Sequence, residues 1–156
     1  MNSELHKYLV EVDELGNWEF PKDGRWDTPF KEIKAVKENI ENIIGSSLDL
    51  DSNVQDASFL TDLGILDERY QEWEKGIITY TYLFSFRFSN FGSMFTVYGS
   101  EWPQCGTKYH LSEAIEFLES KNYKYIPELE LSELYDGVNK PYEQGFTWWT
   151  RYFDYL

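Results

Sequence analysis

Apolar and small polar positions alternate through most of the segment between Gly76 and Gly99, in which Arg87 is the single charged residue. Every second residue over 78–88 is apolar or aromatic, which is the period of a strand with one face on a core. Asn90-Phe91-Gly92 then supplies turn residues, and Met94–Tyr98 is apolar enough to return as a second strand. The pattern predicts a β-hairpin.

Two segments ahead of this hairpin show helical spacing. Apolar residues recur three or four positions apart between Leu5 and Leu15, with Ser3 as a candidate cap and Gly16 as a stop. The second segment begins at Thr28-Pro29, which suits the cap and first position of a helix. Its apolar stripe over residues 30–44 predicts a long amphipathic helix.

Weaker patterns predict the remaining elements. They indicate a strand over Ala57–Leu63, a helix over Ala114–Leu118 capped near Ser112, an edge strand over Tyr123–Ile126, and a helical turn or two over Leu129–Tyr135. Helices first and an antiparallel hairpin afterwards are typical of the α+β class. We therefore expect one domain over residues 1–156, with N-terminal helices packed on a central antiparallel sheet.

The C-terminal sequence FTWWTRYFDYL, residues 146–156, fits both a strand and a helix. A strand would place Phe146, Trp148 and Tyr152 on one face. A helix would gather Trp148, Trp149, Tyr152, Phe153 and Leu156 on one side and leave Thr147, Thr150, Arg151 and Asp154 outside. The β preference of aromatic residues and threonine favours the strand. Either arrangement buries most of the rings, so the segment is expected to close the core.

The chain is strongly acidic, with 28 Asp and Glu against 14 Lys and Arg and a formal charge of −14. A phosphate backbone is bound through clustered basic residues, so nucleic acid is not an expected partner, and anionic membranes would be repelled in the same way. The same field attracts a basic protein, although it would also serve solubility alone. No apolar run approaches the length of a membrane span, and we expect a cytoplasmic protein.

Candidate catalytic and metal-binding residues form no recognisable motif. Asp49, Asp51 and Asn53 alternate as in a calcium loop, but Val54 and Leu60 stand where that loop needs glycine and glutamate. Cys105 and His110 lie close in sequence without a third residue to orient them, and a lone cysteine is usually a small buried hydrophobe. Neither a cofactor nor a metal is expected, and an enzyme is the minority interpretation.

Acidic residues concentrate between Asp49 and Glu74, where eight carboxylates against Arg69 leave a local formal charge of −7. Aromatic residues surrounded by charge are typical anchors of protein interfaces, and carboxylates speed encounter with a basic surface. A solvated acidic face with Trp73 turned inward is the alternative. The predicted partner-binding residues are Asp56, Asp62, Asp67, Glu68, Tyr70, Glu72, Trp73 and Glu74.

The segments QDASFLTDLGI, FRFSNFG and WWTRYFDYL, in a small acidic chain rich in aromatic residues, resemble the immunity proteins of bacterial polymorphic-toxin and contact-dependent inhibition systems. This resemblance implies a protein that binds and neutralises a cognate toxin domain, often a basic nuclease. Two alternatives stay open: another acidic interaction module, such as a nucleic-acid mimic, and a small hydrolase that uses carboxylates.

Overall fold

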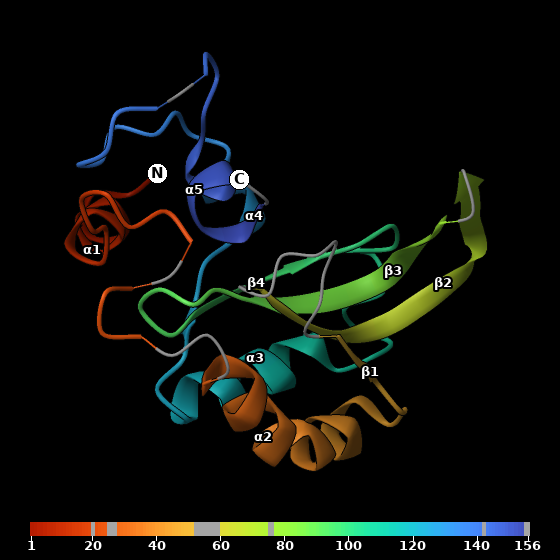
Figure 1. Cartoon of the computed structure of the whole chain (residues 1–156). Coiled ribbons are helices and arrows are strands. Elements are labelled where there is room, and N and C mark those ends of the chain that lie inside the picture. The colour runs from red at the N-terminus through yellow and green to blue at the C-terminus, as the bar shows by residue number, and fades with distance from the viewer. Residues whose placement is uncertain (20, 25–27, 52–59, 75–76, 142, 155–156) are drawn as a thin grey trace.

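Five strands of the described chain form one central sheet, and helices lie on both sides of it (Figure 1). The computed structural model describes the chain except residues 20, 25–27, 52–59, 75–76, 142 and 155–156, and it describes backbone alone at 28–29, 70–74 and 77–80. The elements are α1 (Ser3–Glu11), α2 (Thr28–Ile44), β1 (Asp49–Asp51), β2 (Thr61–Glu74), β3 (Ile77–Phe88), β4 (Met94–Tyr98), α3 (Leu111–Ser120), β5 (Lys124–Tyr125), α4 (Glu128–Leu131) and α5 (Trp148–Phe153).

The strands lie in the order β1-β2-β3-β4-β5. Neighbours from β1 to β4 are antiparallel, and the predicted hairpin is confirmed as β3 and β4, with Arg87 opposite Thr96. The expected antiparallel sheet is wrong at one edge, because β5 runs parallel to β4. The helix α3 connects these two strands, and a helical crossover returns the chain in the same direction. The fold is therefore α+β with a mixed sheet.

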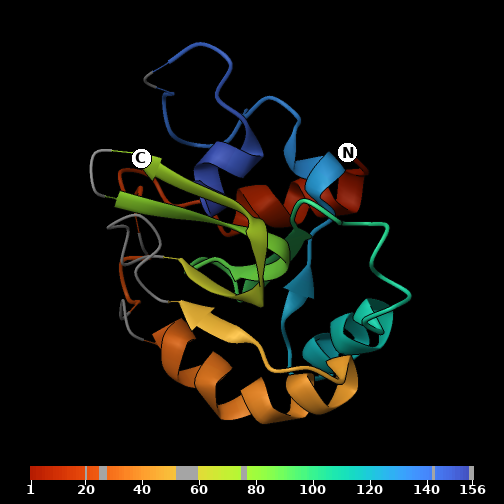
Figure 2. The ribbon, with the colours of Figure 1, turned by 90° about the vertical axis from the view of Figure 1, so that its right-hand side faces the viewer.

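The helices α2 and α3 cover one face of the sheet (Figures 1 and 2). Alternation along β3 turns Phe84, Phe86 and Phe88 toward these helices, and all three side chains are fully buried. The apolar stripe of α2 meets them through Ile33 and Ile40. The predicted long helix is thus confirmed, and its stripe contributes Ile33, Ile40 and Ile44 to the larger hydrophobic core.

A second apolar cluster joins α1, α4 and α5 beside the β3–β4 turn. The helix α1 contributes Leu5 and Leu9, and the turn contributes Phe91. The candidate cap of α1 was misplaced by one residue: the side chain of Asn2, not of Ser3, accepts a hydrogen bond from the Leu5 amide at 2.8 Å. The two clusters lie on opposite sides of the sheet, and the second one packs α1 against α5.

The predicted C-terminal strand is wrong, because residues 148–153 form the helix α5. Thr147 caps it by accepting from the Thr150 amide at 3.3 Å, and the rings of Trp148 and Tyr152 stack one helical turn apart. A strand would need a free sheet edge, whereas this short helix pairs part of its backbone internally and is completed at its start by Thr147, whose carbonyl accepts from the Arg151 amide at 3.0 Å. The expectation that this segment buries its rings is confirmed for Phe146, Trp148, Tyr152 and Phe153.

The weaker predictions differ from the structure mainly at their ends. The strand expected over 57–63 begins at Thr61 in the described chain and continues to Glu74, while residues 57–59 lie outside the described residues. The helix expected over 114–118 is α3, which begins at Leu111 without a side-chain cap. The edge strand is confirmed as β5, and the helix expected over 129–135 is the shorter α4, which ends at Leu131.

Candidate functional site

The eight predicted partner-binding residues fall into three groups. Asp62 and Asp67 are buried, and Glu68 is exposed. Tyr70, Glu72, Trp73 and Glu74 lie in the outer part of β2, where the structure describes the backbone. Asp56 lies outside the described residues. Of the predicted carboxylates with a described side chain, only Glu68 is therefore exposed to a partner.

Asp62 is an internal residue and not part of an acidic surface. Its carboxylate, fully buried, accepts two hydrogen bonds from the Arg87 guanidinium at 3.0 and 2.8 Å. The Tyr98 hydroxyl donates a third at 2.9 Å, and burial together with this carboxylate raises the pKa of Tyr98. Arg87 also donates to the Phe153 carbonyl at 3.0 Å. The pair of Asp62 and Arg87 therefore connects the sheet to α5. Loss of one partner would leave the other charge buried and uncompensated, which strongly destabilises a protein.

Asp67 is likewise internal, and it secures the bend in β2. Its carboxylate accepts from the Arg69 side chain at two atoms, each at 2.8 Å, and from the Ser100 hydroxyl at 2.7 Å. The Arg69 guanidinium, followed by Ser100, holds the pKa of Asp67 well below its usual range. Arg69 also donates to Glu101. These contacts join β2 to the loop that follows β4.

A wide irregularity in the β2–β3 pairing follows Asp67. Asp67 pairs with Thr81, yet the next pair is Gln71 with Tyr80, so three residues of β2 are added against none of β3. Such bulges bend a strand and re-aim its side chains. Beyond this point residues 71–74 and 77–80 form what we call the outer ribbon, which continues past the rest of the sheet (Figures 1 and 2).

A groove of about 620 Å³ opens at the base of the outer ribbon. We call it the ribbon-base groove. Leu66, Leu83 and Tyr109 supply apolar surface, and the Cys105 side chain contributes from the loop between β4 and α3. The rest of the lining is Gln104 and five charged residues: Asp67, Glu68, Arg69, Glu101 and Lys108. Its volume lies within the range that holds small molecules or inserted side chains.

The charges of the ribbon-base groove do not balance. Three carboxylates face two cations, and Arg69 serves both Asp67 and Glu101. Lys108 instead donates to the Tyr109 hydroxyl at 2.9 Å and lies over that ring. Glu68 makes no hydrogen bond or ion pair with any residue that the structure describes. One negative charge at the rim is therefore uncompensated.

No hydrogen bond joins the Cys105 and His110 side chains in the described structure. Burial raises the pKa of the Cys105 thiol, which disfavours the nucleophilic thiolate. The His110 ring lies 3.2 Å from the Glu113 carboxylate. Asp49 and Asp51 belong to β1, and the rest of the calcium-like sequence, residues 52–59, lies outside the described residues. Among the described side chains, no three metal-ligating residues come together.

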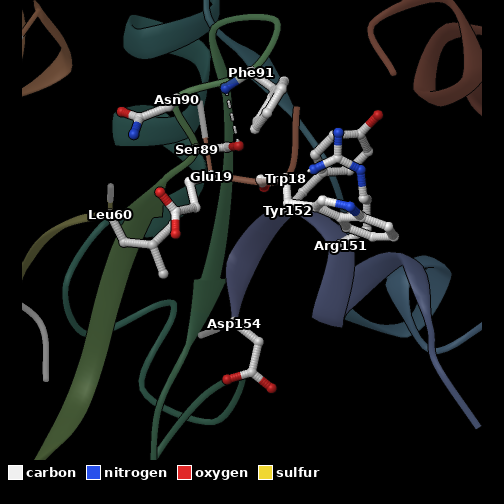
Figure 3. A pocket seen from close by; sticks show the side chains of 9 residues that line it. All are labelled: Trp18, Glu19, Leu60, Ser89, Asn90, Phe91, Arg151, Tyr152 and Asp154. Atoms are coloured by element: carbon white, nitrogen blue, oxygen red, sulfur yellow. Dashed lines mark hydrogen bonds between the residues drawn. The ribbon is translucent and has the colours of Figure 1, made fainter. Parts of the chain in front are cut away.

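A second cavity, of about 20 Å³, lies between α5 and the β3–β4 turn (Figure 3). The Arg151 guanidinium packs against three rings there, with 4.4 Å between its carbon and the Phe91 centroid. The other two rings belong to Trp18 and Tyr152. The Asn90 amide nitrogen is buried without a partner in the described structure. Room for about one water makes this a packing void, not a substrate site.

Sequence reasoning missed the structural role of Arg151, because helical spacing placed it outside. Its side chain is instead buried and donates to Asp13 at 2.7 Å, to the Trp18 carbonyl at 2.9 Å and to the Asn17 carbonyl at 2.8 Å. The available signal in the sequence was a single cationic residue within an aromatic segment. A charge in apolar surroundings is costly unless it is paired and hydrogen-bonded.

A further hollow, of about 310 Å³, is lined by His6 and Asp136, which form a hydrogen-bonded pair with 2.8 Å between Nε2 and Oδ1. Both side chains are substantially exposed, and the pair joins α1 to the segment after α4.

Of the helices that the structure describes, none combines the length and the apolar character of a membrane span. Comparison of the chain with protein-family models, curated protein sequences and solved structures gives no match.

Proposed function

We propose that this protein is an immunity (antitoxin-like) protein, which binds a cognate bacterial toxin domain and neutralises it. The partner is a basic protein domain, and the contact surface is the outer ribbon together with the exposed rim of the ribbon-base groove. This interface excludes Asp62 and Asp67, whose carboxylates are occupied inside the fold.

One observation carries this proposal: the outer ribbon is paired only within itself in the described sheet. β1 pairs with residues 62–64 of β2, and β4 with residues 85–88 of β3. A two-stranded ribbon is marginally stable in water by itself, and its open edges favour pairing with another chain. The ribbon's sequence carries Glu72, Trp73 and Glu74. Tryptophan is a common interface anchor, and carboxylates accelerate association with a basic surface.

Net charge supports the same assignment. A formal charge of −14 over 156 residues raises the rate of encounter with a cationic domain and repels nucleic acid. A protein that must reach a toxin before the toxin reaches its target benefits from a fast association rate. The proposal therefore predicts binding that weakens as ionic strength increases.

The experiment first determines whether the gene directly upstream encodes a large secreted protein with a basic C-terminal domain, and then uses that domain. Co-expression with the wild-type chain is expected to restore growth, and the two proteins should form a stoichiometric complex. Trp73→Ala should weaken that complex by about tenfold to a hundredfold, the range of an interface anchor. Glu4→Gln, an exposed charge loss on α1, serves as the matched control and should bind normally.

Two results would contradict the proposal. The first is a wild-type chain that neither binds this domain nor protects cells from it. The second is turnover of a substrate by the chain alone that is abolished by one conservative Glu→Gln change, which would indicate a hydrolase.

A further inference from the structure

We infer that the ribbon-base groove receives one arginine side chain of the partner protein. This inference rests on the proposed function and adds the chemistry of the central contact. The guanidinium would pair with Glu68 at the rim, and the aliphatic stem would lie along Leu66 and Leu83.

Charge complementarity identifies the occupant as a cation. The lining has one more carboxylate than it has cations, and Glu68 is exposed without a partner among the described residues. Arg69 is held by Asp67 and Glu101, so its guanidinium is not positioned to neutralise Glu68. A single incoming cation would balance the groove.

The apolar surface identifies arginine as the cationic side chain. Leu66 and Leu83 are half-buried, and the Tyr109 ring packs on the core residue Phe84 at 5.1 Å between centroids. Guanidinium groups are planar and weakly hydrated, so they tolerate such surroundings better than ammonium groups do. They also form paired hydrogen bonds to one carboxylate. A long side chain with an apolar stem and a flat cationic head therefore matches this surface.

The groove is held in a fixed shape before any partner arrives. Asp67 joins the bend of β2 to Ser100 and Arg69, and Arg69 reaches Glu101 on the opposite wall. The Glu101 amide donates to the Leu83 carbonyl at 3.0 Å, which holds that loop against β3. A preformed site loses less conformational entropy on binding.

The first test is independent of any toxin. Acetyl-arginine amide is titrated into the isotope-labelled full chain at low salt, with acetyl-citrulline amide as the uncharged isostere. Saturable chemical-shift changes are expected at the amides of residues 66–69 and 101–109 with arginine and not with citrulline. Glu68→Gln should abolish them, whereas Glu4→Gln should not. Equal shifts with citrulline, or no saturable shifts at these amides, would overturn the inference.

The second test measures the affinity of the chain for the toxin domain that is used to test the proposed function. Glu68→Gln should weaken binding by about threefold to tenfold, because a rim carboxylate is partly solvated. Lys108→Gln should strengthen binding by a similar factor, because it removes a competing cation. General destabilisation of the protein would weaken binding in both variants, so it would not produce affinity changes of opposite sign. Unchanged affinity in both variants would refute the groove contact, while absent wild-type binding would refute the proposed function and leave the first test standing.

Discussion

Arg151 on α5 and Asp13, two residues beyond the end of α1, form an ion pair that is enclosed by the protein. The Arg151 Nε lies 2.7 Å from Asp13 Oδ1, and both side chains have no exposed surface. The Asp13 carboxylate also accepts from the Val138 amide at 2.9 Å, the Asn139 side chain at 3.1 Å and the Tyr135 hydroxyl. One carboxylate thus connects α1, α5 and the segment between α4 and α5.

Replacing Arg151 by methionine is expected to destabilise the protein by about 3–5 kcal/mol, because Asp13 would remain buried without its cation. Urea unfolding followed by circular dichroism measures this loss. Lys7→Met is the control, since Lys7 and Glu11 form an exposed pair on α1 and its loss should cost less than about 0.5 kcal/mol. Equal stability of the two variants would show that the enclosed pair does not hold these segments together.

Gly137 permits the approach of the Asp13 carboxylate. A Cβ atom at this position would lie 2.2 Å from Asp13 Oδ2 and 2.6 Å from the Tyr135 ring. Gly137→Ala must displace these groups and is expected to cost about 2–3 kcal/mol in the free energy of unfolding. Gly145→Ala is the comparison, because its cost of about 1 kcal/mol comes from a φ of +83° with open space around it. A Gly137→Ala variant more stable than Gly145→Ala would contradict the close approach.

Asp67 should make stability depend on pH in the acidic range. Its hydrogen bonds from Arg69 and Ser100 lower its folded-state pKa below the unfolded value of about 3.9. Its stabilising contribution is therefore complete above that value and declines as the pH falls toward the folded pKa. Asp67→Asn should be less stable than the wild type at neutral pH and should approach it at acidic pH. Unfolding free energies in urea across this range test the trend, and a constant difference between the two proteins would contradict it.

The outer ribbon should be dispensable for folding. In the described sheet its strands pair with each other alone, beyond the residues that β1 and β4 contact. Replacing residues 71–80 by Asn-Gly leaves a short loop between the Asp67–Thr81 pair and should change the melting temperature by only a few degrees. The shortened chain is expected to lose toxin binding. Unfolding of the shortened chain would instead show that the ribbon supports the core.

Local periodicity determined several elements before any tertiary contact was known. Alternation over 78–88 required a strand, and the following turn residues required the β3–β4 hairpin. The apolar stripe of α2 similarly identified its helix and its buried face. These features are predictable because side chains return to the same face of a strand or helix every few residues. The buried face therefore appears as a regular spacing of apolar residues in the sequence.

Only the tertiary structure decided which charges are surface and which are internal. Asp62, Asp67 and Glu68 look alike in sequence, yet two are buried and one is exposed. Their roles depend on partners elsewhere in the chain: Arg87 is 25 residues from Asp62, and Arg151 is 138 residues from Asp13. The same holds for α5. Its aromatic composition favours a strand, but the structure has a helix that Thr147 caps and that places Arg151 beside Asp13. Periodicity reports the face that a residue occupies within its own element, whereas burial of a charge depends on a counter-charge that the fold alone brings near.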